Sequence, residues 1–303
     1  MKSILKSIII YSCLLFCSAI QALENTNHRI VVIGDLHADI GLAREVFRLA
    51  GGTDENDAWV GGSLVIVQLG DLIGRSYEER EVLDFILAVQ DKAEAAGGKL
   101  HILLGNHEVF GARLDFSWVD ERSFAAYKGI PGLKLDDPRL QHLPVNQRAR
   151  GAALMPGGHY ARKMAGFSTV LKLGDTIFVH GSVTPYWAEY GINRINEEVS
   201  EWFAGNSQES YSSIGYDRRN NDRVMWNRQF SLHVSEEDCR DLEKSLSILG
   251  AKRMIVAHTV HESITARCNE RVWAIDVGMS RAYQGSMQVL EIIDDEMISV
   301  IKP

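Results

Sequence analysis

Five short polar motifs, spread over more than two hundred residues, each follow a run rich in Val, Ile and Leu. The motifs are GDLH at 34–37, GDLIGR at 70–75, GNHE at 105–108, HG at 180–181 and AH at 257–258. Such runs are typical of buried strands in an α/β sheet. The polar side chains therefore follow strand ends, where open α/β sheets build their sites. Asp, His and Asn supply the oxygen and imidazole donors that suit divalent metals of the Mn, Fe and Zn type.

The rest of the chain continues the alternation of strands and helices. Helical spacing of apolar residues predicts helices at 39–49, 78–96, 184–203 and 236–249. Gly174 and Asp175 predict a two-residue hairpin turn between strands at 168–173 and 176–179. The last strands are expected at 253–257, 272–277, 287–293 and 297–301, and the segment rich in Ser, Asn and Gly at 205–215 is expected to be a loop.

Length and charge limit the function. A chain of 303 residues with 46% apolar residues can bury a sizeable core as one large domain or two ordinary ones. Its net charge of −8 argues against a nucleic-acid binder that works through a general basic face. The charge says little about a phosphorylated substrate, because bound metal ions would supply the local positive charge.

Residues 1–22 have the outline of a secretory signal peptide. Lys2 and Lys6 form a positive start, residues 8–16 are mostly apolar, and small residues precede a cleavage position near Ala22. The apolar stretch is shorter than the ~20 residues that a membrane span requires. We therefore expect cleavage, no stable membrane insertion and a secreted or periplasmic protein. Cleavage leaves only Cys239 and Cys268, which could pair in an oxidising compartment or remain as buried thiols.

The five motifs, in this order over roughly residues 30 to 280, resemble those of the calcineurin-like metallophosphoesterases of the phosphoprotein phosphatase type. The strings GNHEVF and VHGSVTPYWAEYGINRIN look most like the Shewanella-like protein phosphatases. The resemblance implies an α/β fold of four layers, in which two mixed sheets pack together between helices.

The resemblance also implies the site residues and their roles. Asp35 and His37 would bind a first divalent metal, and Asp71 would bridge it to a second. The remaining ligands of the second metal would be Asn106, His180 and His258. A bridging carboxylate can hold two cations ~3.5–4 Å apart, and a hydroxide bound to them attacks the phosphorus in line. Mn is the metal that we expect to support activity in vitro.

Three further residues match positions that act on the substrate. His107 matches the proton donor to the leaving alkoxide, and Arg75 and Arg228 match phosphate-binding arginines. Gly74 departs from the family, which usually has an Asp there to orient the catalytic His. Restoring the carboxylate as Gly74→Asp is expected to raise turnover unless Gly74 adopts a positive φ. His261 stays unassigned, with a role in supporting a ligand open.

The chain from 23 to 303 is expected to be a single domain with a cap-like insertion at about 110–166. This segment holds four of the six prolines and has weak periodicity. It either reaches over the site or forms a solvated excursion at the periphery. Tyr160, Arg162 and Lys163 within it are candidates for shaping the substrate.

The resulting hypothesis is a metal-dependent phosphomonoesterase that acts on phosphorylated proteins or small phosphoesters. A hydrolase of nucleotides or dinucleoside polyphosphates is the alternative that Gly74 suggests, and export argues against it. A weakly active, metal-bearing protein that binds phosphorylated partners is a third hypothesis, against which the complete ligand set argues. The sequence leaves open the native metals, the phosphorylated residue preferred and the oligomeric state.

Overall fold

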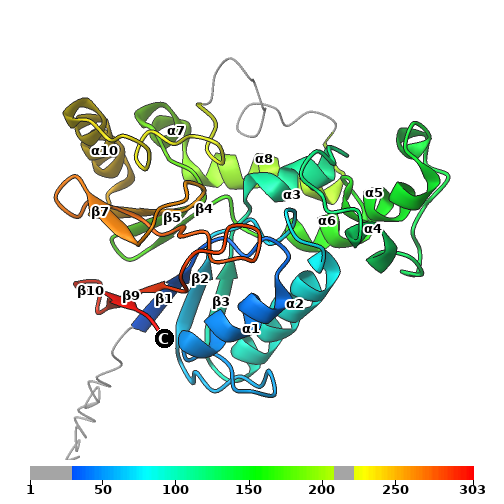
Figure 1. Ribbon diagram of the computed structural model, residues 1–303. Coiled ribbons are helices and arrows are strands. Elements are labelled where there is room, and N and C mark those ends of the chain that lie inside the picture. The colour runs from blue at the N-terminus through cyan, green and yellow to red at the C-terminus, as the bar shows by residue number, and fades with distance from the viewer. Residues whose placement is uncertain (1–28, 208–221) are drawn as a thin grey trace, which may run out of the picture.

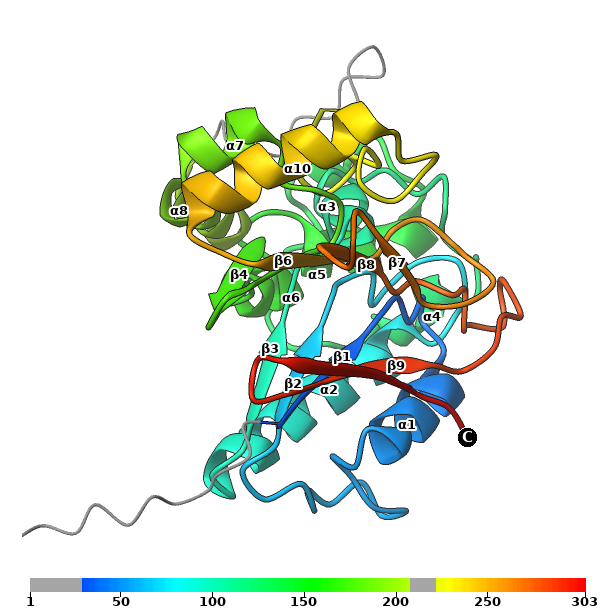
Figure 2. The ribbon, with the colours of Figure 1, turned by 90° about the vertical axis from the view of Figure 1, so that its left-hand side faces the viewer.

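The apolar runs that predict strands form two five-stranded sheets in the computed structural model, which describes residues 29–207 and 222–303. The two sheets are stacked, and helices cover the outer face of each (Figure 2). A single hydrophobic cluster contains buried side chains from both sheets, among them Val67 of the first and Ile255 of the second. The predicted α/β fold, with two mixed sheets flanked by helices, is confirmed.

The first sheet gathers both ends of the described chain. Its strands are β1 (Arg29–Ile33), β2 (Val65–Gln68), β3 (Lys99–Ile102), β9 (Val289–Ile293) and β10 (Met297–Ile301), in the spatial order β10-β9-β1-β2-β3. Strands β1, β2 and β3 are parallel, and β9 and β10 add antiparallel pairs at one edge. Because parallel strands end at the same edge, the loops that follow β1, β2 and β3 lie together.

The second sheet is built from the later strands. They are β4 (Val170–Leu173), β5 (Thr176–Val179), β6 (Arg253–Val256), β7 (Thr265–Arg267) and β8 (Val272–Ala274), in the order β4-β5-β6-β8-β7. Strands β5, β6 and β8 are parallel, and both edge strands are antiparallel. Leu173 pairs with Thr176, which confirms the predicted two-residue turn at Gly174 and Asp175.

Helices form the outer layers. Helices α1 (Ile40–Leu49) and α2 (Glu79–Ala95) cover the first sheet, and α7 (Pro185–Tyr190), α8 (Ile192–Ala204) and α10 (Glu236–Leu249) cover the second (Figure 2). Helix α1 begins where the Asp39 side chain accepts a hydrogen bond from the Leu42 backbone N–H at 3.1 Å. Its buried residues recur at the helical spacing that the sequence predicts.

The predicted insertion consists of short helices and loops at one side of the molecule (green in Figure 1). Helix α3 (Asn106–Ala112) leads into it. The insertion itself contains α4 (Ser123–Ala126), two short 3₁₀ turns, η1 (Pro138–Leu140) and η2 (Val145–Gln147), and the helices α5 (Arg148–Leu154) and α6 (His159–Met164). A small satellite core that includes Leu140, Leu143 and Met155 holds these pieces together.

Two predicted elements differ from the structure, and one short strand was not predicted. The helix expected at 184–203 is two helices, because Gly191 takes φ +98° between α7 and α8 and breaks the helical path. The strand expected at 272–277 ends at Ala274, and the short strand β7 was not predicted. Most of the loop expected at 205–215, like the signal peptide, lies outside the described residues.

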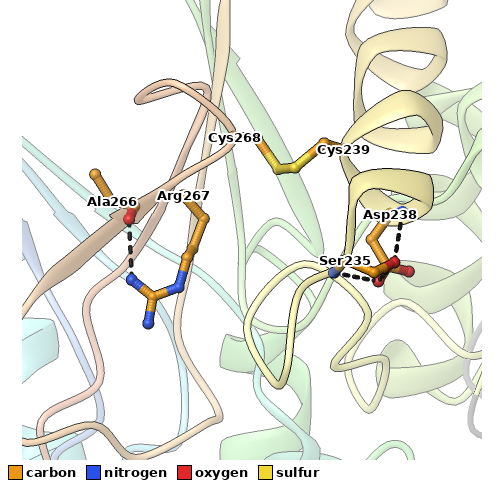
Figure 3. Close-up of a disulfide and its surroundings, with 6 residues drawn as sticks. All are labelled: Ser235, Asp238, Cys239, Ala266, Arg267 and Cys268. Atoms are coloured by element: carbon orange, nitrogen blue, oxygen red, sulfur yellow. Dashed lines mark hydrogen bonds between the residues drawn. A yellow bond between two sulfur atoms is a disulfide. The ribbon is translucent and has the colours of Figure 1, made fainter.

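Cys239 of α10 and Cys268, in the turn after β7, form a disulfide (Figure 3). The bond ties a helix on the outer face of the second sheet to the edge of that sheet. Nearby, Ser235 caps α10 by accepting a hydrogen bond from the Asp238 backbone N–H at 3.2 Å. Among residues 29–207 and 222–303, no helix combines the length and the apolar character needed to cross a bilayer.

Candidate metal centre

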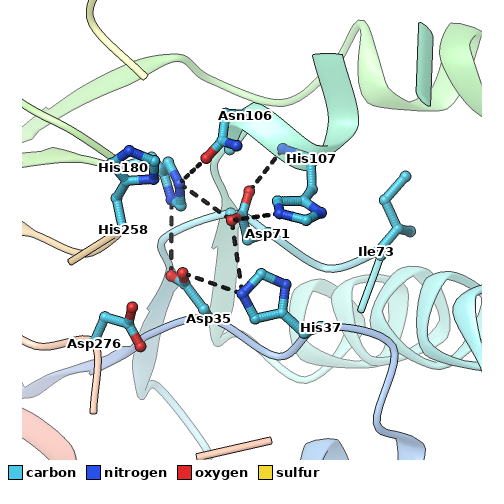
Figure 4. A network of polar contacts seen from close by, with 12 residues as sticks. Asp35, His37, Asp71, Ile73, Asn106, His107, His180, His258 and Asp276 are labelled. Carbon is cyan, nitrogen blue, oxygen red and sulfur yellow. Dashed lines mark hydrogen bonds and ion pairs between the residues drawn. The ribbon is translucent and has the colours of Figure 1, made fainter. Parts of the chain in front are cut away.

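The six predicted metal ligands converge at the strand ends where the two sheets meet (Figure 4). The loops after β1 and β2 and the start of α3 contribute from the first sheet, and the loops after β5 and β6 contribute from the second. The residues brought together are Asp35, His37, Asp71, Asn106, His180 and His258. Parallel strands within each sheet explain the convergence, because their carboxyl ends share an edge.

Asp71 lies at the centre of this group. Its Oδ2 is 3.8 Å from Nε2 of His37 and 3.4 Å from Nε2 of His180. Burial alone would raise the pKa of Asp71, but the nearby His180 and His107 hold it well below its usual range. The donor atoms form two groups, each within 4.8 Å: His37, Asp71 and His107, and Asp71, His180 and His258. Asp71 belongs to both groups, as a carboxylate shared by two cations would.

Buried polar atoms without partners indicate that the donors suit cations. Oδ1 of Asp35, Nδ1 of His37 and Oδ2 of Asp276 are buried without a hydrogen-bond partner among the described residues. Burial, together with the negative charges of Asp276 and Asp71, raises the pKa of Asp35 well above its usual range. Three carboxylates in one buried space repel one another, and divalent cations would relieve that repulsion. The residues therefore fit a metal centre.

The backbone of the donor loops is unusual. His37, Asp71 and His258 have φ values of +46°, +53° and +64°. Asp and His tolerate this left-handed region better than most residues, yet it costs on the order of 1–3 kcal/mol and is typical of functional sites. Hydrogen bonds offset part of this backbone cost, because the carbonyl of Asp71 accepts from the N–H groups of Leu36 at 3.1 Å and His37 at 2.9 Å.

Glu108 locks the loop that carries Asp71 against the start of α3. Its fully buried carboxylate accepts hydrogen bonds from the backbone N–H groups of Asp71 and Leu72 at 2.9 Å and of Gly105 at 2.8 Å. The backbone N–H of His107 in turn donates to Oδ1 of Asp71 at 2.9 Å. Burial raises the pKa of Glu108 to about 7, and the neighbouring Asp71 adds to the effect. The last residue of the GNHE motif thus fixes the loop that carries Asp71.

His107 lies in the same cluster, with Nε2 3.9 Å from Oδ2 of Asp71 and its ring edge-on to His37 at 4.7 Å between ring centres. Its other nitrogen faces Gly74, where a Cβ built on the glycine would lie 2.1 Å from Nδ1. Gly74 also has φ +81°. Because φ is positive, Gly74→Asp is not expected to raise turnover. A side chain at this position would displace His107.

The donors open into a cavity of about 240 Å³ with two arginines and an aromatic wall. The guanidinium of Arg75 lies 4.1 Å from the centre of the Trp118 ring, and its backbone N–H donates to the Trp118 carbonyl at 2.7 Å. Arg228 donates from Nη1 to the His258 carbonyl at 2.6 Å. Phe110, Trp118, Trp226 and Tyr283 supply the aromatic lining. Both predicted arginines therefore border the same space as the metal donors.

Sequence reasoning missed Asp276 and Tyr283, which also line this cavity. Oδ1 of Asp276 accepts a hydrogen bond from the Gly278 backbone N–H at 2.9 Å, and burial raises the pKa of the carboxyl. The sequence did contain a signal for Asp276, because this residue follows the apolar run that includes β8, just as Asp35 follows β1. Tyr283 lies in a loop without periodicity and gave no such signal.

The three candidates from the insertion lie elsewhere. The hydroxyl of Tyr160 is directed to Oδ1 of Asp84 at 2.6 Å, and its ring is buried in the core. Arg162 donates to the Gly157 carbonyl, and Lys163 is exposed to solvent. None of the three lines the metal cavity. Tyr160 of α6 faces α2, and Arg162 lines a different cavity. Instead, Phe110 and Trp118 are the residues of the 110–166 stretch that line the metal cavity.

His261 supports a neighbour rather than lining the cavity. Its backbone N–H donates to the Asp276 carbonyl at 2.9 Å, which holds the loop after β6 against the loop after β8. Its Nε2 is buried without a hydrogen-bond partner among the described residues.

The fold and the donor set define the class of metal-dependent phosphoesterases, and comparison with known proteins agrees. Residues 28–262 match the calcineurin-like phosphoesterase family. The chain is 37% identical to Shewanella-like protein phosphatase 2 of Arabidopsis thaliana, over 90% of this chain and 77% of that protein. This chain therefore belongs to the calcineurin-like metallophosphoesterases and, within them, to the Shewanella-like protein phosphatases.

Two further relatives extend the comparison. Shewanella-like protein phosphatase 1 of Plasmodium berghei is 27% identical over 84% of this chain and 68% of that protein. The crystal structure of a cold-active protein-tyrosine phosphatase of a psychrophilic Shewanella species is similar in fold, with a TM-score of 0.68 and 20% identity. That alignment covers 91% of this chain and 81% of the other.

Proposed function

We propose that this protein is a two-metal phosphomonoesterase that removes phosphate from phosphorylated proteins. The observation that carries the proposal is the position of Asp71 in two groups of metal donors on the floor of a cavity that also contains two arginines. A phosphate dianion requires such a concentration of positive charge, and two adjacent cations with a bidentate guanidinium provide it.

In this proposal Asp35 and His37 would hold one cation, and Asp71 would serve both. The other cation would be held by Asn106, His180 and His258. Bound cations would supply a nucleophilic water at neutral pH and draw charge from the phosphoryl oxygens. The protein holds the donors in place through Glu108, whose hydrogen bonds fix the turn on which Asp71 lies.

His107 is the residue that we assign to protonating the leaving oxygen. Burial lowers the pKa of His107 to about 3, although the charge of Asp71 opposes that effect. Its neutral ring still carries one N–H, and a phosphate dianion in the cavity would favour protonation. Arg75, stacked on Trp118, and Arg228, held by the His258 carbonyl, are placed to hold the phosphate.

We further propose that phosphotyrosine is the preferred residue. Trp118, Trp226 and Tyr283 line the cavity that holds the donors, and an aryl phosphate can pack its ring against aromatic side chains at favourable distances. The Shewanella protein of similar fold is named a protein-tyrosine phosphatase. Phosphoserine, which has no ring, would gain less from the same walls.

The test compares four substrates with Mn present: a phosphotyrosine peptide, a phosphoserine peptide, p-nitrophenyl phosphate and a dinucleoside polyphosphate. We expect kcat/KM to be highest for the phosphotyrosine peptide. Asp71→Asn should lose both metals by elemental analysis and nearly all turnover. Faster hydrolysis of the dinucleoside polyphosphate would favour the nucleotide hydrolase hypothesis, and tight phosphopeptide binding without turnover would favour the binding protein.

We also propose that the chain is exported and cleaved near Ala22. The signal-like composition of residues 1–22 and the disulfide between Cys239 and Cys268 both suit an oxidising compartment. N-terminal sequencing of the protein recovered from the fractionated source cell tests this. A chain in the cytosolic fraction that retains Lys2 would contradict export.

A further inference from the structure

A second cavity lies beside the insertion, separate from the metal centre. We call it the cap cavity; its volume is about 840 Å³, and its lining comes from the C-terminal end of α3, from the insertion and from the end of α8. Figure 1 shows α4, α5 and α6 gathered on this side of the molecule. None of the residues that line the metal cavity also lines the cap cavity.

Three basic residues that line the cap cavity, Lys134, Arg139 and Arg162, are exposed, and we call them its basic rim. Arg113, which is half-buried, also lines the cavity, and among the described lining residues Asp137 is the only carboxylate. Asp137 is paired with Arg139 through two hydrogen bonds, of 3.0 Å and 2.9 Å. Since the whole chain has a net charge of −8, this local excess of positive charge opposes the trend of the molecule.

Leu114, Leu133 and Met155 line the cavity and also pack in the satellite core. They are less exposed than the basic rim, and we call them the apolar floor. His159, on the wall, has its pKa lowered by burial and then by the charges of Lys163 and Arg162. A hollow with an apolar floor and a basic rim suits a chain that offers both carboxylates and hydrocarbon, which describes an acidic stretch of polypeptide.

Helix α3 connects this cavity to the metal centre. Its first residues, Asn106 and His107, line the metal cavity, and Ala112 at its end lines the cap cavity. With a rise of 1.5 Å per residue, the two ends of α3 are roughly 9 Å apart. An extended peptide covers about 3.3–3.6 Å per residue, so one substrate chain of moderate length can reach both cavities.

We propose that the cap cavity binds an acidic segment of the protein substrate, several residues away from the phosphorylated residue in the metal cavity. This inference rests on the proposed phosphoprotein phosphatase activity and adds a determinant of its specificity. A nucleic acid is a poorer occupant, because it would extend its charge beyond the cavity over a surface of net negative charge. A short run of Asp or Glu places its charge only where the rim is basic.

The first experiment measures kcat/KM for paired phosphotyrosine peptides. One peptide has a run of four Glu beginning about three to eight residues from the phosphotyrosine, on either side, and its partner has Gln at the same positions. The wild-type enzyme should prefer the Glu peptide through a lower KM. The double variant Lys134→Glu, Arg162→Glu should lose that preference, with a fall of about five- to tenfold in kcat/KM for the Glu peptide. Its turnover of p-nitrophenyl phosphate and of the Gln peptide should be unchanged.

The matched control carries Lys128→Glu and Lys302→Glu, and we call it the control variant. Both lysines are exposed, and neither lines the cap cavity. The control variant changes the net charge by the same amount and should leave the preference for the Glu peptide intact. An equal loss in the control variant would overturn the cavity in favour of a general charge effect. A parallel loss of p-nitrophenyl phosphate turnover in the double variant would likewise overturn docking.

The second experiment does not depend on turnover. A fluorescent, unphosphorylated peptide with the same run of Glu should bind the wild-type protein, weaken with added salt and bind the double variant at least about fivefold more weakly. This result would stand even if the phosphatase proposal failed. Equal binding of the Gln peptide, or tighter binding of a single-stranded oligonucleotide of the same charge, would overturn the assignment to an acidic polypeptide.

Discussion

Gly74 sets the position of the imidazole of His107. A Cβ at residue 74 would lie 2.1 Å from Nδ1 of His107, and the backbone there has φ +81°. We therefore predict that Gly74→Ala displaces His107 and lowers turnover of alkyl phosphates by roughly 10²-fold or more, which is the scale of a general-acid contribution. Turnover with bound metal content measured in parallel checks this, and Gly74→Asp should behave in the same way.

Gly97→Ala is the control for backbone strain. Gly97 has φ +83°, close to the value at Gly74, and a Cβ there would meet nothing within 4 Å. Both variants pay a similar conformational cost, of about 1 kcal/mol, but only Gly74→Ala collides with the imidazole. If the two variants retained equal activity, the contact between Gly74 and His107 would not matter to the reaction.

His107 can be separated from the metal ligands through the leaving group. His107→Asn removes the proton donor while Asp71, His180 and His258 still offer their atoms. Phosphoserine needs a protonated leaving oxygen, so we predict a loss of roughly 10²–10⁴-fold in its turnover. Aryl phosphates with acidic phenols should lose much less. Comparable losses on both substrates, together with a lower metal content, would make His107 a ligand instead.

A buried ion pair joins the insertion to the first helical layer. Arg150 of α5 donates to the carboxylate of Glu79 of α2 at 2.7 Å and 2.9 Å, and both side chains are almost wholly buried. The same carboxylate accepts from the Gly74 backbone N–H at 3.0 Å and from the hydroxyl of Tyr127 at 3.0 Å. The pair therefore links the helices of the insertion to the turn that contacts His107.

Removing one partner should leave a buried charge. We predict that Arg150→Met lowers the free energy of unfolding by about 3–5 kcal/mol, and that Glu79→Gln added to it recovers part of the loss. Urea denaturation measures both. Arg122→Met, which removes the exposed pair with Asp120, should lower the free energy of unfolding far less, because water screens that pair. If Arg150→Met lowered the free energy of unfolding by a similarly small amount, water would have to reach Glu79 in the variant.

At the scale of elements, the sequence predicts helices and strands that have regular apolar spacing, and it predicts the polar residues that follow the ends of strands. Asp35, Asp71 and His180 follow apolar runs, and parallel strands bring such positions to one edge whatever the connecting helices do. The insertion has no such rule. Tyr160 is a candidate for the site by sequence, but the direction of a short helix such as α6 depends on tertiary packing that local spacing does not encode.

The family pattern itself can mislead where backbone geometry decides. The absence of an Asp at position 74 suggests a missing partner for His107, and only the φ angle and the approach of the imidazole show that no side chain fits there. The position of Trp118 is equally hard to predict. Its stacking on Arg75 depends on a loop of the insertion that contacts the GDLIGR motif. Neither contact has a sequence signature.

On the scale of the whole molecule, the metal centre is one of two places where polar groups join the sheets; at the other, Asp295 between β9 and β10 accepts a hydrogen bond from Arg253 of β6 at 2.9 Å. Asp35, His37 and Asp71 follow strands of the first sheet, and His180 and His258 follow strands of the second. Burial raises the pKa of Asp35 and of Asp276, and the negative charge of Asp71 adds to the effect on both. Cations bound here would link the two halves of the fold.

We therefore predict that removing metal destabilises the whole chain as well as abolishing turnover. A cation present at a hundred times its Kd adds about 2.7 kcal/mol to the free energy of unfolding, which corresponds to a shift in Tm of several degrees. Calorimetry of the chelated protein, titrated back with Mn, measures this shift. Asp71→Asn should unfold at a Tm that no longer responds to Mn, because the shared ligand is weakened. An equal Tm with and without Mn in the wild-type protein would mean that the cations do not join the two sheets.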